Sequence, residues 1–169
     1  MPREPNIARC ASCRALYWVG LAGQVGFVLP GEALSGEKAA WAGLPVISRP
    51  GEEDYFDALT AGLAQSPDQE LELRVHAWWR GNDRCRGSED RGGLPVEARA
   101  LENLERIIEL TREGDHEYVL FRAEALRQLG RFDEAREALH GLCSDYAIAR
   151  EKILELIREK SRNLGVLFA

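Results

Sequence analysis

Two cysteines near the N-terminus, Cys10 and Cys13, have the spacing of a metal-binding pair. Two thiolates in a Cys-X-X-Cys arrangement can hold one side of a structural zinc ion, which needs about four nitrogen or sulfur ligands. The chain has one close pair, so a complete site requires two further ligands, for which His76 and Cys85 are the candidates. Zinc is the one cofactor that the sequence indicates. Two ordinary reduced thiols are the simpler alternative, and a redox dithiol would need a helix N-terminus to lower the thiol pKa.

A second candidate site lies where aromatic and charged residues meet, at residues 78–84. Adjacent tryptophans on a helix point in different directions, so at least one of them is expected near a surface or an interface. Tryptophan and arginine together can form a groove for a peptide or a carboxylate. A buried aromatic helix end with solvated flanking charges is the alternative. The candidate partner-binding residues are Trp78, Trp79, Arg80, Asp83 and Arg84.

The sequence nominates no catalytic residue. His76, His116 and His140 are far apart, with no HExxH motif and no Cys or Asp at a spacing typical of a catalytic constellation. No glycine-rich phosphate loop follows a predicted strand. We therefore expect a protein that is not an enzyme.

The composition and the apolar periodicity of the chain change at Arg49-Pro50-Gly51. Residues 1–50 form a glycine-rich N-terminal segment, in which the β-leaning runs 15–19 and 25–29 predict a small hairpin. Residues 44–47 could add an edge strand, since Pro45 excludes a central one. Residues 51–169 are expected to form a helical domain.

Within residues 51–169 the apolar side chains recur with a helical period. A long exposed loop is predicted at 81–95, which contains several glycines and a proline. The predicted helices span about 52–65, 67–80, 96–113, 117–129, 132–142 and 146–160.

Residues 118–142 have the pattern of two helices joined by a turn. Ala123 and Ala135 are small where the two helices would approach closely, and Gly130 permits the turn. In this spacing the stretch resembles a tetratricopeptide repeat, a unit of two antiparallel helices about 34 residues long. It departs from the repeat at Arg122, Leu142 and Ala147.

The resemblance covers one repeat unit. Leu101 stands where a preceding unit would need a small residue, so a regular tandem array is not expected. Because a lone unit cannot bury both of its faces, its neighbours must stack on it. The predicted fold is mainly α, with stacked antiparallel helical hairpins and a small N-terminal β segment.

The first cysteine pair also resembles half of a zinc ribbon, because Cys10 and Cys13 are followed by the aromatic run Leu16-Tyr17-Trp18. Arg14 stands where such zinc knuckles often carry glycine. Taken with the segment 77–83 and the repeat-like part, the chain is similar to uncharacterised bacterial proteins. That resemblance implies no activity.

Composition restricts the class of protein further. Of the 169 residues 45% are hydrophobic and 30% are charged, the balance of a folded helical protein. No apolar stretch has the length of a membrane span and no signal peptide is evident, so a cytoplasmic protein with no membrane partner is expected. The net charge of −6 argues against nucleic acid as the main partner.

These observations predict a non-enzymatic adaptor that binds a protein or peptide, with its oligomeric state left open. The alternative is a zinc-binding regulatory module that contacts nucleic acid or protein through the cysteine pair.

Overall fold

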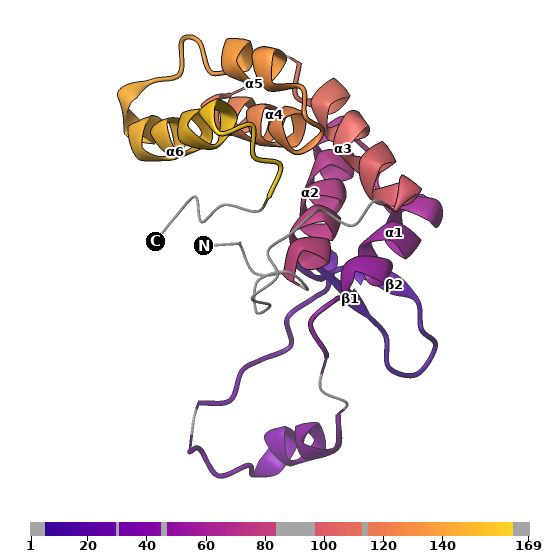
Figure 1. Cartoon of the computed structure of the whole chain (residues 1–169). Coiled ribbons are helices and arrows are strands. Elements are labelled where there is room, and N and C mark those ends of the chain that lie inside the picture. The colour runs from indigo at the N-terminus through magenta and orange to yellow at the C-terminus, as the bar shows by residue number, and fades with distance from the viewer. Residues whose placement is uncertain (1–5, 30, 45–46, 84–96, 113–114, 164–169) are drawn as a thin grey trace.

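A computed structural model of the chain describes residues 6–29, 31–44, 47–83, 97–112 and 115–163. The fold is mainly helical, with one small antiparallel sheet near the N-terminus (Figure 1). The strands and short 3-10 helices are β1 (Ile7–Arg9), β2 (Leu16–Trp18), η1 (Val19–Leu21), η2 (Gly36–Gly43) and η3 (Ser144–Tyr146). The α-helices are α1 (Glu52–Thr60), α2 (Pro67–Asp83), α3 (Ala98–Leu110), α4 (His116–Gln128), α5 (Phe132–Ala138) and α6 (Ala147–Arg158).

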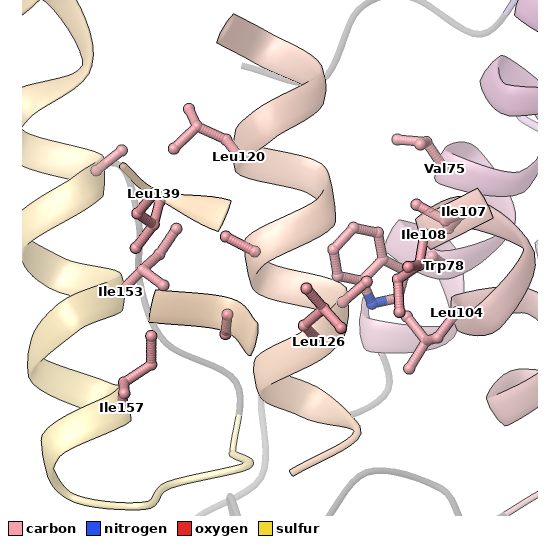
Figure 2. Packing of buried hydrophobic residues seen from close by; sticks show 14 of the residues in the cluster. Val75, Trp78, Leu104, Ile107, Ile108, Leu120, Leu126, Leu139, Ile153 and Ile157 are labelled. Atoms are coloured by element: carbon pink, nitrogen blue, oxygen red, sulfur yellow. The ribbon is translucent and has the colours of Figure 1, made fainter. Parts of the chain in front are cut away.

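The helices form a body in which each packs on its neighbour along the chain, and α6 returns to α4 (Figure 1). Figure 2 shows α4 between two groups of apolar side chains. Leu139, Ile153 and Ile157 lie on one side of it, while Val75, Trp78, Leu104 and Ile107 lie on the other. One continuous core therefore joins α2, α3, α4, α5 and α6.

Small residues let α4 and α5 approach each other closely. The side chains of Ala123 and Ala135 are completely buried, as are those of Leu126 and Leu139. Gly130 lies between the helices with φ +81°, a left-handed conformation that a side chain would strain. The sequence correctly placed both helices and the turn between them.

Two helices end earlier than their apolar periodicity predicted. α1 stops at Thr60 rather than near residue 65, and α5 stops at Ala138 rather than at residue 142. Gly62 (φ +70°) and Gly141 (φ +79°) follow these ends in the left-handed region. A left-handed glycine closes a helix, so backbone geometry overrides the apolar pattern there.

The predicted pairing of residues 15–19 with residues 25–29 is wrong. β2 pairs instead with β1, in the register Ile7 opposite Trp18. Ile7 and Trp18 bury their side chains in a second apolar cluster against α1 and α2, and the Trp18 indole N–H donates to the carbonyl of Leu63 at 3.0 Å. Residues 25–29 find no such surface and form no strand. The edge strand predicted at 44–47 includes residues outside the described part.

Between β2 and α1 the chain leaves the body as an arm, here called the apolar arm (residues 19–49), which hangs away from the helices in Figure 1. The arm packs on itself: a Cβ at Gly26 would lie 2.2 Å from the Trp41 ring. Lys38 lies 5.7 Å from the centre of the Phe27 ring, and its ammonium is 2.5 Å from a carboxylate oxygen of Glu32.

Among the described residues, no helix is long and apolar enough to cross a bilayer.

Candidate functional site

The two cysteines lie at the tip of the β1–β2 hairpin, in a tight turn. The Cys10 amide donates to the carbonyl of Ala15 at 2.8 Å, and the Arg14 amide donates to the carbonyl of Cys10 at 3.0 Å. Arg14 has φ +63°, in the region that favours glycine. The backbone at residue 14 is therefore left-handed, at the position where zinc knuckles often carry glycine, although the residue here is arginine.

Arg9 fastens this tip to α1. Its guanidinium donates to the Arg14 carbonyl at 3.1 Å, to Asp54 Oδ1 at 2.6 Å and to Asp57 Oδ2 at 2.6 Å. Burial of Asp54 opposes ionisation, but the Gly51 amide and then Arg9 outweigh it and hold the pKa of Asp54 below its ordinary value. One arginine side chain therefore links the turn to two carboxylates of the first helix.

Both thiols at the tip are free of disulfides. Cys13 is exposed and Cys10 is half-buried. The backbone N–H groups of Cys13 and Ser12 point toward the Cys10 sulfur and lower the pKa of the Cys10 thiol. The lowered pKa eases formation of the Cys10 thiolate, which is the form of cysteine that binds a metal.

The remaining predicted zinc ligands do not join this pair. His76 is buried, with its ring stacked on Tyr55 (centroids 5.2 Å apart, planes 12° apart) and edge-on to Trp79 at 5.3 Å. Burial, and then the charge of Arg80, lower the pKa of His76. Cys85 lies outside the described residues. In the described part of the chain, no three His, Cys, Asp or Glu side chains gather around a point that could hold a metal.

The predicted partner-binding residues divide between core and surface. Trp78 is buried, 8% exposed, and its indole N–H donates to Gln128 Oε1 at 2.9 Å. Trp79 is half-buried and lies edge-on to Phe121 at 5.9 Å, which continues the row Tyr55, His76, Trp79. The side chain of Trp78 is therefore occupied within the body, and only part of Trp79 faces solvent.

The charged members of the same set lie at the end of α2. Arg80 Nη1 is 3.1 Å from Asp83 Oδ2, and Asp83 is exposed. Arg84 belongs to the chain outside the described residues. The structure thus brings Arg80 and Asp83 together at the end of α2, the helix that also carries the half-buried Trp79.

A small cavity of about 20 Å³ lies between α1, α2 and α3. Its polar lining includes Glu52, Asn82 and Asn103. This volume is the size of one water molecule and does not admit a substrate. Gly81 sits at its wall, where a Cβ would lie 2.6 Å from a Glu52 carboxylate oxygen, so a side chain at position 81 would displace the Glu52 carboxylate.

A wider, open depression of about 410 Å³ lies beside Glu70. Arg106, against some burial, and then Arg74 lower the pKa of Glu70 to about 2. Each guanidinium Nε lies 2.8 Å from Glu70 Oε1. A carboxylate bound in this way remains ionised and is unsuited to exchange protons near neutral pH.

A buried polar network along α4 escaped the sequence analysis. Glu124 accepts hydrogen bonds from Arg127 at 2.8 and 2.6 Å and from Gln128 Nε2 at 2.9 Å, and Gln128 in turn accepts the Trp78 indole N–H. Arg127 is completely buried and also donates to the carbonyl of Ser161. The i, i+3, i+4 spacing of these residues was the available signal, but such charged sets usually lie on a solvated face.

No protein family, no curated protein and no solved structure matches this chain.

Proposed function

We propose that this protein is a non-enzymatic adaptor whose apolar arm binds another protein. The observation that carries the proposal is the exposure of large apolar side chains along the arm, which ranges from 39% at Leu34 to 86% at Val25. An apolar surface of this extent on a folded protein usually marks an interaction site. The exposed set is Val19, Leu21, Val25, Phe27, Val28, Leu29, Leu34, Leu44 and Ile47.

The backbone of the arm favours a particular kind of partner. Within the described residues, the amides and carbonyls of Gly23–Val28 make no hydrogen bond to other backbone groups. Residues 19–29 also carry no charged side chain. The Gly26 carbonyl accepts a long hydrogen bond, 3.5 Å, from the Gln24 side chain. An uncharged segment whose backbone groups are not paired with other backbone groups can add as a strand to an exposed sheet edge, with its side chains filling apolar pockets beside that edge. The proposed partner is a protein with such an edge.

The helical body would hold the arm and offer a second contact. We propose that α4 and α5 form a tetratricopeptide-like hairpin, supported by the buried Ala123 and Ala135 and by the left-handed Gly130. The second contact is the exposed edge of Trp79 with Arg80 and Asp83.

The test compares an arm variant with a matched body variant. Val25→Asp with Phe27→Asp places two charges on the arm, while Ile148→Asp places one charge on α6 at an apolar residue that is 84% exposed. A photo-crosslinker at Leu29 identifies the partner in cells, and the purified partner is then titrated with each variant. We expect the arm variant to lose binding at least tenfold and Ile148→Asp to bind like the parent protein.

Hydrogen exchange tests the strand mode directly. On binding of the identified partner, the amides of residues 23–28 should exchange more slowly, because they become paired. Equal binding by the arm variant, or unchanged exchange at these amides in the complex, would refute the role of the arm.

A second candidate function is a zinc-binding regulatory module, favoured by the turn that brings Cys10 and Cys13 together around Arg14. Such a module would contact nucleic acid or protein through the hairpin tip. Nucleic-acid binding that weakens steeply with salt would favour it over the adaptor, because phosphate contacts release counterions.

A further inference from the structure

We propose that Cys10 and Cys13 form half of a tetrahedral zinc site that is completed by the same two cysteines of a second copy of the chain. The inference goes beyond the adaptor function and does not depend on the arm. It identifies both a metal site and the partner that shares it.

The hairpin tip holds the two thiols as a rigid pair of possible metal ligands. Cys10 and Cys13 share one turn, closed by the backbone hydrogen bonds to Ala15 and Arg14 and held on α1 by Arg9. Ile7 and Trp18 at the base of the hairpin are buried, with 1% and 9% exposure. Two thiols positioned in this way lose little conformational freedom when they bind an ion.

Cys10 and Cys13 supply only two of the ligands that a structural zinc ion needs. A structural zinc site needs four, and within the described ranges no third His, Cys, Asp or Glu joins the pair. His76, the described candidate, is held in the core between the rings of Tyr55 and Trp79. Two further thiolates at the right spacing exist on an identical tip, so a two-fold pairing of tips supplies a site of four thiolates.

The hairpin tip is accessible to a second copy of the chain. Cys13 is exposed, and the tip turns outward at the edge of the molecule, away from α4, α5 and α6 (Figure 1). A pairing of two tips therefore leaves the helical bodies on opposite sides of the metal.

The net charge of the proposed zinc site must also be offset. Zinc with four thiolates carries a net charge of −2, and each chain already carries −6. Arg14 is exposed on the same turn, one residue after Cys13, and its charge also acts on Asp54 of α1, so each copy carries one positive side chain near the proposed site. Two such arginines offset the charge of the site, which gives a reason for arginine in a left-handed position where glycine would be unstrained.

The experiment measures metal content and mass together, on the full chain without a histidine tag and under a phosphine reductant that excludes disulfides. Zinc is added in increments to metal-free protein while native mass spectrometry and sedimentation record the species. We expect one zinc per two chains, a dimer that forms with the metal, and a return to monomer on addition of a chelator.

Variants assign the ligands. Cys13→Ser should abolish both zinc binding and the dimer, while Cys143→Ser, at a half-buried cysteine in another part of the chain, should change neither. Cys85→Ser should also change neither. Arg14→Glu should weaken the zinc dimer at least tenfold, and circular dichroism confirms that each variant is folded.

Three results would overturn the proposal: one zinc per monomeric chain that is lost in Cys85→Ser, a dimer that persists without metal, or no zinc binding at all. The arm variant Val25→Asp with Phe27→Asp should still form the zinc dimer. Failure of the arm to bind a partner and failure of the tip to bind zinc are therefore separate outcomes.

Discussion

The helical body and the apolar arm differ in where their large apolar side chains lie. In the body Leu126, Leu139 and Ile153 are completely buried, whereas Val25 and Leu21 of the arm are 86% and 80% exposed. Burial of apolar area is the main favourable contribution to folding, so the body is stabilised by its own sequence. In the described part of the arm most large apolar side chains are exposed, although Gly26 contacts Trp41, so they gain little of this stabilisation and are available to another molecule. The comparison indicates that stability and recognition reside in different parts of this protein.

The largest effect is expected from the buried charge pair of the body. Glu124→Leu removes the carboxylate that pairs with the buried Arg127, which should lower the free energy of unfolding by about 3–5 kcal/mol. Denaturant unfolding followed by circular dichroism measures the change. The double variant Glu124→Leu with Arg127→Met should recover most of the loss. A single variant as stable as the parent protein would show that the pair contributes little to the body.

A core substitution in the same helix should have the next largest effect. Leu126→Ala opens a cavity in the core cluster that joins α2 to α6 and should cost about 2–5 kcal/mol in the free energy of unfolding. The same unfolding measurement tests it. A cost below about 1 kcal/mol would mean that the core collapses around the gap and is less tightly packed than the burial indicates.

The pH dependence of stability should arise from two residues of the body, His76 and Glu70. The pKa of His76 is lowered by burial, so the unfolded chain binds a proton more readily. Stability should therefore decline as the pH falls below about 6.5, the ordinary pKa of histidine. Glu70 has a pKa lowered from 4.5 to about 2, so a second decline should follow between those pH values.

Thermal unfolding at a series of pH values measures both declines. His76→Gln should remove the first decline and leave the second, while Glu70→Gln should reduce the second. A first decline that persists in His76→Gln would have to arise from another group.

The smallest effect on stability is expected in the arm. Phe27→Ala should change the free energy of unfolding by less than about 0.5 kcal/mol, because the side chain is 65% exposed. Ile148→Ala, on the exposed face of α6, is the matched control. A loss comparable to that of Leu126→Ala would show that the arm folds with the body, and would remove the contrast between the two regions.

Local patterns in the sequence predicted the helices well and their ends less well. Apolar periodicity located α2, α3, α4 and α6 to within a few residues, because one buried stripe repeats along each of them. The ends of α1 and α5 depend instead on the left-handed backbone of Gly62 and Gly141, which periodicity does not report.

The candidate site was predicted in part. The sequence singled out Cys10 and Cys13 as a pair, but it did not predict the β1–β2 hairpin whose tip carries them. The roles of Cys10, Cys13, Trp79, Arg80 and Asp83 in binding stay predictions. The burial of Trp78 agrees with the alternative of a buried aromatic helix end, whereas the burial of His76 was not predicted, because it depends on Tyr55, which lies far from it in the sequence.

Local sequence was sufficient to predict the helical class and the turn at Gly130, since each follows from the types of neighbouring residues. The packing of distant segments was needed to establish which strand pairs with β2, that Glu124 and Arg127 are buried, and that the arm stays uncovered. The physical reason is the same in each case. Whether an apolar or charged side chain is buried depends on surfaces that distant segments bring to it, and those surfaces exist only once the helices have packed.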